Sequence, residues 1–164
     1  TAVVPNRGVA RTVHGMPGWR APAHMSQTVE AGGLAFLSGI LGVDEAGNPV
    51  ESALALPRAV RAQAAGKIGR DAVALQCLAC IDSLRRQLHA AGHGLDRVVH
   101  LSVYVQDIDS FKVVERLLAK AFGRWRPAII ALEVPWPGPV AGARMSLTAI
   151  AWFGAGKPAV AFNN

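Results

Sequence analysis

Residues 124–153 read RWRPAIIALEVPWPGPVAGARMSLTAIAWF and contain two short apolar runs, separated by a connection rich in proline and glycine. The runs, 128–134 and 145–153, are rich in aliphatic and β-branched residues and are bounded by breakers of regular structure, a pattern typical of β-strands. In the second run, apolar side chains alternate with a mixed set that includes Thr148 and Trp152. Successive side chains of a strand point to opposite faces, so one face of the predicted sheet should carry the core and the other should meet something else.

The composition fits a single domain. The chain has 164 residues, of which 51% are hydrophobic and 17% are charged, and its net charge is +6. A chain of this length can bury a proper core, and we assign 23–153 to the domain, 1–22 to an N-terminal arm with a short strand near 9–14, and 154–164 to a C-terminal tail. No apolar run approaches the roughly 18 residues of a membrane span, and no signal-peptide pattern is present, so we expect a soluble, cytoplasmic protein.

The remaining elements follow from periodicity. Alternation predicts a hairpin from 25–30 and 34–43 and a strand over 95–107, while helical spacing predicts helices over 71–91 and 110–122. The order ββαβαββ, with an additional strand in the arm, indicates an α+β fold in which two helices cover one face of a mixed sheet.

The other face of this sheet is left uncovered by the chain. We expect it to carry Ile129, Ile150 and Trp152, a large apolar area to leave in water at about 25 cal/mol per Å². A closed homo-oligomer would remove this cost. The Ser38-Gly39 pair interrupts the second hairpin strand and marks a bulge or a close backbone approach there.

Two short motifs suggest metal or redox chemistry but fit packing better. Cys77 and Cys80 form a single C-x-x-C, whereas a structural zinc site needs a second ligand pair and a thioredoxin-like motif lies at a strand-to-helix turn. Both cysteines fall inside a predicted helix, which favours buried structural thiols. His89 and His93 have the spacing of a helical metal pair, but Gly92 ends the helix between them, so we expect no metal and no cofactor.

Segment 52–70 concentrates positive charge. Arg58, Arg61, Lys67 and Arg70 lie in what we predict to be a loop with a short helix. The charges can serve an anion or RNA, or can simply be solvated, and the solvated surface is favoured. No aromatic platform and no histidine pair suited to RNA cleavage accompanies them, so a nucleic-acid partner is not expected.

Five short segments are specific in combination. They are the strand with Ser38-Gly39, the helix ending Ala90-Ala91-Gly92, residues 103–111 with their aspartates, Arg126-Pro127-Ala128 and Ala149-Ile150-Ala151. With them, 23–153 resembles the Rid family, also called YjgF or L-PSP proteins. The resemblance implies a chorismate-mutase-like α+β fold and a homotrimer with a small-molecule pocket at each subunit interface.

The resemblance also implies an activity, the hydrolysis of enamines and imines such as 2-aminoacrylate to keto acids and ammonia. In the family, an arginine after the Pro-Ala motif grips the substrate carboxylate, and the matching residue here is Ile129. The two family residues that follow this arginine correspond to Ile130 and Ala131 in this chain. The glutamate of the last strand, thought to position water, matches Thr148, and a tyrosine of the first strand matches Met25.

Of the family's site residues, Ser38 is clearly retained, while an asparagine of the second helix matches Glu115. Isoleucine cannot pair with a carboxylate, and burying that group unpaired costs several kcal/mol, so we do not expect ordinary 2-aminoacrylate deamination. The predicted pocket is apolar with few hydroxyls and suits an uncharged small molecule. Its predicted lining is Met25, Ser38, Ile129, Ile130, Ala131 and Thr148.

Three functions stay open. The first is an enzyme acting on an imine or enamine-type intermediate, with Glu115 or Glu133 as the acid/base group if burial raises its pKa, although a surface charge is the simpler explanation of each. The second is a non-catalytic trimer that binds a small molecule or acts as an accessory protein. The third is an RNA-binding or endoribonuclease-like translation inhibitor.

Overall fold

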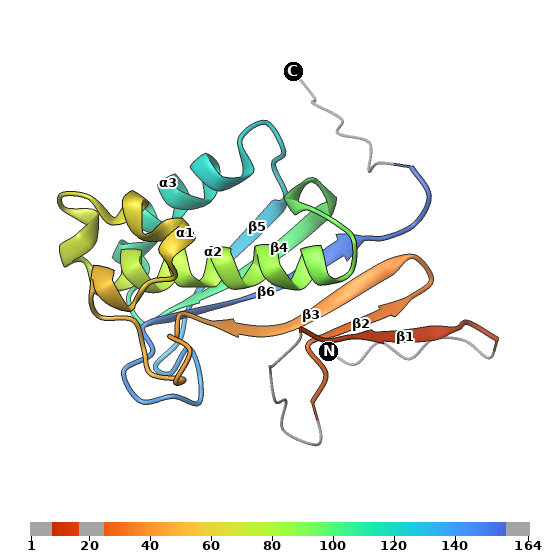
Figure 1. Ribbon diagram of the computed structural model, residues 1–164, viewed down its shortest axis with the longest axis horizontal. Coiled ribbons are helices and arrows are strands. Elements are labelled where there is room, and N and C mark those ends of the chain that lie inside the picture. Colours follow the sequence, from red (N-terminus) through yellow and green to blue (C-terminus); the bar gives the residue numbers. More distant parts are fainter. Residues whose placement is uncertain (1–7, 17–24, 157–164) are drawn as a thin grey trace.

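The protein forms a six-stranded sheet in the order β1-β2-β3-β6-β4-β5 (Figure 1). The structure, a computed structural model, describes residues 8–16 and 25–156. All neighbouring strands are antiparallel except β4 and β5, which are parallel. The strands are β1 Arg11–His14, β2 Thr28–Ala31, β3 Leu34–Leu41, β4 Val98–Val105, β5 Ala128–Glu133 and β6 Met145–Trp152.

Strands β2 and β3 form the predicted hairpin. Gly32 and Gly33 make its turn with φ values of 60° and 78°, a region that is free of strain only for glycine. Strand β2 begins at Thr28, so Met25 precedes the strand instead of opening it. Strand β1 pairs with β2, so part of the predicted N-terminal arm extends the sheet. Residues 1–7 and 17–22 of that arm, 23–24 of the predicted domain and 157–164 of the predicted tail lie outside the described residues.

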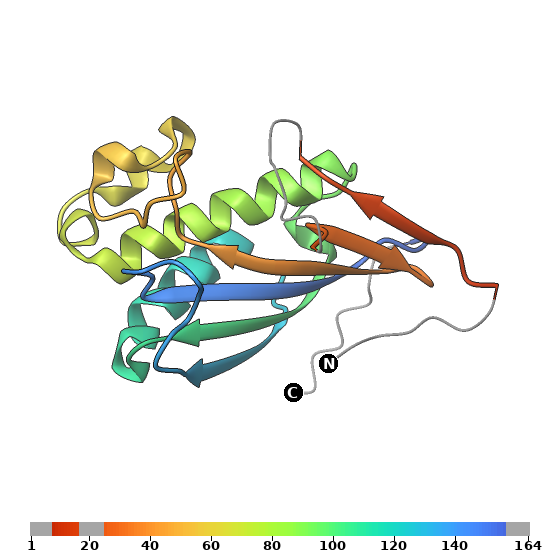
Figure 2. The same ribbon diagram turned by 90° about the horizontal axis from the view of Figure 1, so that it is seen from below.

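Helix α2, Ala72–Ala90, is the longest element of the covered side (Figure 2). The Asp71 carboxylate accepts hydrogen bonds from the backbone N–H groups of Val73 and Ala74 at 2.9 and 3.1 Å, which satisfies donors at the helix start. Gly92 follows the helix with φ 78°. The predicted cap and stop are therefore confirmed. No helix among the described residues is long and apolar enough to cross a membrane.

Helix α3, Phe111–Phe122, carries the chain from β4 to its parallel neighbour β5. Asp107 caps the 3-10 turn before it by accepting a hydrogen bond from the Asp109 N–H at 2.9 Å. The connection between β3 and α2 contains the short helix α1, Arg58–Arg61, as predicted for a loop with a short helix. The 3-10 turns of the chain are Ala53–Ala55, Ala62–Ala64, Ile68–Arg70, Leu95–Arg97 and Ile108–Ser110.

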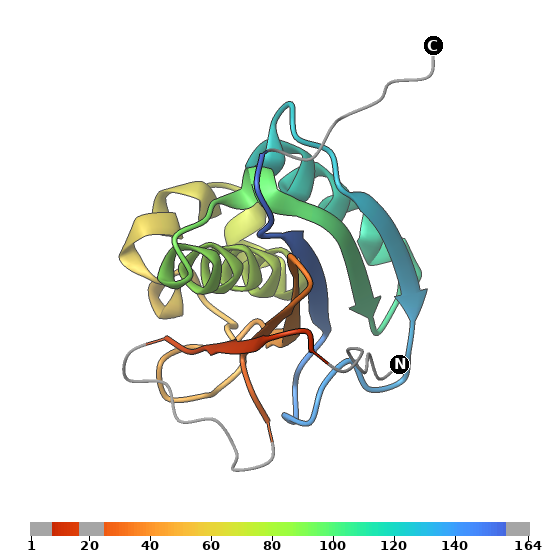
Figure 3. The same ribbon diagram turned by 90° about the vertical axis from the view of Figure 1, so that its right-hand side faces the viewer.

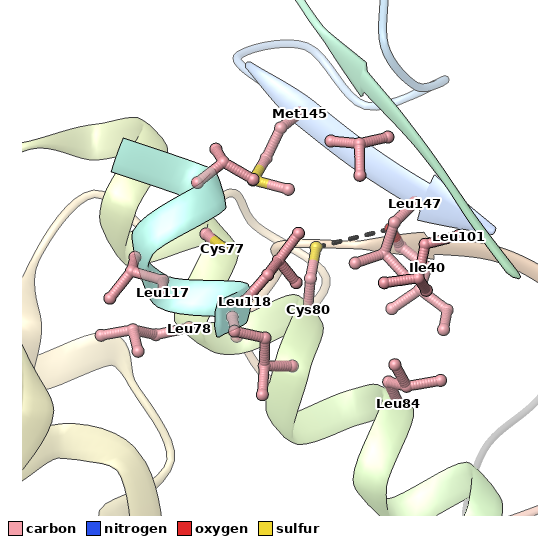
Figure 4. Packing of buried hydrophobic residues seen from close by; sticks show 14 of the residues in the cluster. Ile40, Cys77, Leu78, Cys80, Leu84, Leu101, Leu117, Leu118, Met145 and Leu147 are labelled. Carbon is pink, nitrogen blue, oxygen red and sulfur yellow. Dashed lines mark hydrogen bonds between the residues drawn. The ribbon is translucent and has the colours of Figure 1, made fainter. Parts of the chain in front are cut away.

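The core lies between the helices and one face of the sheet (Figure 4). Alternate residues of β6 and β4 point into it, which confirms the predicted alternation of β6. The fully buried side chains on these strands and helices include Leu101, Val103, Met145, Leu147, Leu78, Leu84, Leu88 and Leu118.

Both cysteines are free and buried in this core. Burial raises the pKa of the Cys77 thiol to about 12, and burial together with the charge of Cys77 raises the pKa of Cys80 well above its ordinary value. The Cys80 Sγ lies 3.5 Å from the Ile40 carbonyl oxygen (dashed line in Figure 4). Because the thiolate is disfavoured, these are structural thiols, as predicted.

The register corrects one expectation about the uncovered face. Ile129 pairs with Leu101, which is fully buried beneath the helices, so Ile129 shares the helix-covered face and not the face of Ile150 and Trp152. Its neighbour Ile130 lies on the open face instead. A run of consecutive apolar residues does not fix which of them faces the core, and a shift of one residue exchanges the faces.

Candidate functional site

The open face of strands β3, β6, β4 and β5 carries one imidazole and no other ionisable side chain except the Tyr104 phenol. Figure 3 shows α2 against one side of the sheet, and among the described residues no helix covers the other side of β6 and β4. The register assigns alternate residues to this bare side, and none of those residues carries a carboxylate, ammonium or guanidinium group. They are Leu34, Phe36, Leu41, His100, Ser102, Tyr104, Ala128, Ile130, Leu132, Ser146, Thr148, Ile150 and Trp152.

A transverse row of residues crosses the middle of the open face. Ser102 of β4 pairs with Thr148 of β6 on one side and with Ile130 of β5 on the other. The register of β3 against β6 shifts at Ser38 and Gly39, which places this predicted bulge beside Thr148. Opposed side chains on neighbouring strands have Cβ atoms about 5 Å apart. The structure therefore brings three of the predicted pocket positions, Ser38, Thr148 and Ile130, into one row.

Ser38 ties this row to the start of the hairpin. Its hydroxyl donates a hydrogen bond to the Ser26 carbonyl, and its N–H donates to the Gln27 carbonyl at 2.8 Å. Met25, which precedes Ser26 in the chain, is 45% exposed. The Ser38 hydroxyl oxygen keeps acceptor capacity for a ligand, because a hydroxyl has two lone pairs.

Ile129 and Ala131 do not join the row. They pair with Leu101 and Val103 on the helix-covered face of β5, the last strand of the sheet. Ile129 is nevertheless 37% exposed, because β5 is the edge strand of the sheet that residues 8–16 and 25–156 form. The predicted pocket residues thus occupy both faces of an edge strand, and one chain by itself does not gather them into one cavity.

Neither predicted acid/base candidate lies on the open face. Glu133 lies on the helix-covered face of β5, where its Oε2 accepts a hydrogen bond from the Ile108 N–H at 3.0 Å. Glu133 therefore has a structural partner at the turn before α3. Glu115 is exposed on α3.

One polar pair on the open face was missed from the sequence. His100 Nε2 and Ser102 Oγ lie 3.1 Å apart, within hydrogen-bond distance, and both side chains are half-buried. The signal was the spacing of two residues on a strand, which puts both side chains on one face. That spacing matches no catalytic motif, so it does not stand out in a sequence.

A basic hollow of about 1600 Å³ lies elsewhere, between α2 and the connection that precedes it. Several of its cations already have partners. The Arg61 guanidinium donates to the carbonyl oxygens of Leu54 and Leu56 at 2.8 and 3.0 Å, and Arg86 pairs with Asp82 at 2.9 Å. None of the predicted pocket residues lines this hollow. Within residues 8–16 and 25–156, no group of three or more His, Cys, Asp or Glu could hold a metal ion.

Known proteins resemble this chain in sequence and in structure. A family model described as Endoribonuclease L-PSP matches residues 19–152. A RutC family protein from Pyrococcus horikoshii is 27% identical over 109 residues, which are 66% of this chain and 72% of that protein. The crystal structure of a putative endoribonuclease L-PSP from Entamoeba histolytica is 26% identical, with a TM-score of 0.65 over 87% of this chain and 99% of that one. A Rid family protein of unknown function from Yersinia pestis has a TM-score of 0.68 at 21% identity, with the same coverage of 87% and 99%, and it shares the fold.

Proposed function

The chain belongs to the Endoribonuclease L-PSP family, and from this premise we propose that it forms a homotrimer that binds an uncharged small metabolite between neighbouring copies. The observation that carries the proposal is the bare sheet face. Phe36, Ile150 and Trp152 are only half-buried there, and Ile130 is 50% exposed. Water contact with this area costs about 25 cal/mol per Å², and association removes the cost.

The split of the pocket residues between two faces favours a ring over a two-fold dimer. Thr148 and Ile130 lie on the open face, whereas Ile129 and Ala131 lie behind the β5 edge. A two-fold dimer joins identical surfaces, but a ring joins a different surface of each copy to the next. In a ring, the β5 edge of one copy borders the open face of its neighbour, and both sets of residues then line one pocket.

The charge of the pocket supports a neutral ligand. No lysine or arginine lies among the open-face residues of β3, β6, β4 and β5, and Ile129 occupies the position at which the resemblance predicts a carboxylate-binding arginine. A buried carboxylate would therefore lack a partner, at a cost of several kcal/mol. The proposed reaction is hydrolysis or conversion of an imine or enamine-type intermediate that carries no carboxylate. Glu115 and Glu133 are the acid/base candidates that the sequence suggested, but Glu115 is exposed on α3 and the Ile108 N–H already binds the Glu133 carboxylate.

Three measurements test this function. Sedimentation at micromolar concentration should give three chains per particle, and a monomer would overturn the assembly. Neutral imines or their ketone products should raise the unfolding temperature more than matched 2-keto acids do. Hydrolysis of enzymatically generated iminopyruvate that is abolished by Ser38→Ala would overturn the neutral-substrate assignment. Binding without product formation would instead support the non-catalytic accessory function.

RNA binding is the third alternative, and it rests on the basic connection before α2. Arg58, Lys67 and Arg70 are exposed there, whereas Arg61 holds backbone carbonyls. Phosphate contacts make affinity fall steeply with salt. Single-stranded RNA should therefore be titrated at several salt concentrations against the wild type and an Arg58→Gln/Arg70→Gln variant. Binding that is absent, or that is unchanged in the variant, rejects this alternative.

A further inference from the structure

The open face contains a single imidazole, and it sits in an apolar setting. His100 pairs with Ile150 of β6 on one side and Ala128 of β5 on the other. Ser102, two residues further along β4, lies within hydrogen-bond distance of the His100 ring. In the neighbouring strand β6, Ser102 is paired with Thr148. A histidine, a serine and a threonine therefore form a compact polar group on a face that is otherwise largely aliphatic and aromatic.

The hydrogen bond orients the imidazole. A hydroxyl both donates and accepts, so the Ser102 Oγ can stay bonded to His100 Nε2 whether that nitrogen carries a proton or not. The ring is thus held in place throughout a proton transfer. Histidine is the side chain best suited to exchange protons near neutral pH. The glutamates considered for this role lie on α3 and on the opposite face of β5, away from this group.

We propose that His100 is the proton-transfer residue of the open-face pocket, with Ser102 as its positioning residue and Thr148 as the hydroxyl that holds water or substrate. This inference rests on the proposed function, because a neighbouring copy must close the face into a pocket. It deepens that function by naming the substrate class: a neutral ketimine with a free C=N–H group, or its enamine tautomer.

The reaction balances with water as the co-reactant. The water oxygen bonds to the imine carbon, the C=N electron pair moves to nitrogen, and the proton that water loses passes to the His100 imidazole. The nitrogen takes that same proton from the His100 imidazolium, which gives a neutral carbinolamine and leaves His100 neutral again. His100 then accepts the hydroxyl proton as the C–N bond breaks and returns a proton to the leaving nitrogen. One imine and one water give one ketone and one ammonia, and His100 ends in its starting state.

The experiment follows ammonia release from benzophenone imine, a carboxylate-free ketimine, above the rate in buffer. His100→Asn should lower kcat by about 10²-fold or more, because general acid–base catalysis typically contributes 10² to 10⁴-fold. Added imidazole should restore part of the lost rate. Ser102→Ala should lower kcat by about tenfold and change the pH profile, while Ser102→Thr should restore the profile. Thr148→Val should act mainly on KM.

Matched variants separate a chemical effect from a structural one. His89→Asn changes an exposed imidazole on α2 and should leave the rate unchanged, and Glu115→Gln compares the alternative base. Each variant is checked for particle mass and unfolding temperature, so that loss of assembly is not read as loss of chemistry.

The possible failures are distinct. A wild-type enzyme whose rate survives His100→Asn overturns this assignment and leaves the proposed pocket standing, and a rate lost only with Glu115→Gln moves the role to that residue. A wild-type trimer that binds the imine without hydrolysing it overturns the proton-transfer role. A monomer that neither binds nor hydrolyses the imine overturns both this inference and the proposed function.

Discussion

The two faces of the sheet differ in whether the chain completes them. On the covered face, Leu147 and Leu101 are fully buried by residues of the same molecule. On the open face, Ile150, which is on the same strand β6 as Leu147, remains partly exposed. At the sheet edge, Ile130 of β5 is 50% exposed. Both faces are rich in apolar residues, so composition alone does not tell a core from an interface. The helices decide the difference, because they cover only one side.

The largest expected effect tests whether the covered face is sealed. With a pKa of about 12 against an ordinary 9.0, Cys77 should hold about 10³-fold less thiolate than a free thiol at pH 8. Cys77 and Cys80 should therefore react with a thiol reagent at least that much more slowly in the native protein than in urea. Rapid native labelling of either cysteine would show that the covered face opens to solvent.

Two substitutions on one strand compare the faces directly. Leu147→Ala should lower the free energy of unfolding by about 2 to 5 kcal/mol, because it leaves a cavity in the closed core. Ile150→Ala should cost less in dilute protein and should raise the concentration at which the particle dissociates. Urea unfolding at several protein concentrations measures both effects. Equal losses at the lowest concentration would contradict the distinction between the faces.

Gln76 tests how the covered face holds the β5–β6 connection. This fully buried side chain donates to the Gly142 carbonyl at 3.1 Å and accepts from the Arg144 N–H at 2.8 Å. Gln76→Ala leaves both backbone groups without that partner and should cost about 1 to 3 kcal/mol. The measurement is urea unfolding, with amide exchange at Arg144 as a local readout. An unchanged exchange rate at Arg144 would show that the connection is held by other contacts.

The smallest effect concerns His93, where the end of α2 meets the end of β6. Its ring centroid lies 3.9 Å from that of Phe153, and burial, followed by the nearby Arg97 charge, lowers its pKa below the ordinary 6.5. As the pH falls, His93 therefore takes up a proton in the unfolded chain at a higher pH than in the native state. The native state loses stability below about pH 6.5, and above that pH the effect is absent. Glu30, His14 and Asp96 also act on this ring.

Replacing the ring should flatten this pH dependence. Between pH 7 and pH 5, the unfolding temperature of wild type should fall by about 2 °C more than that of His93→Gln. Identical pH profiles of the two proteins would show that the protonation of His93 is not linked to folding.

Much of the fold was predictable because several local signals agreed. Asp71 and Gly92 bracket a helix with a regular apolar stripe, and the Gly32-Gly33 pair supplies a hairpin turn. Which residues of β5 face the helices was not predictable, because the neighbouring positions 129 and 130 are both isoleucine.

The open-face site was only partly predictable. Ser38 and Thr148 do meet in one row, but their predicted partner Ile129 lies on the other face. In β4, a register shift between Val98 and His100 buries Val98, which strict alternation starting at Val99 would have placed on the outside. The hydrogen bond between His100 and Ser102 lies beyond this shift and needs only the regular alternation of β4 from His100 onward.

The exposed β5 edge should make the yield of folded protein depend on its concentration. A single copy presents Ile129, Ile130 and Leu132 at 37%, 50% and 45% exposure, along a strand that has no outer neighbour among the described residues. Such a strand pairs readily with any available strand, correct or not. When the protein is synthesised slowly, few folded copies are present to cover the β5 edge of each new one. When many unfolded chains are present, their strands can pair with this edge incorrectly. The yield of native particles should therefore depend on how assembly competes with aggregation.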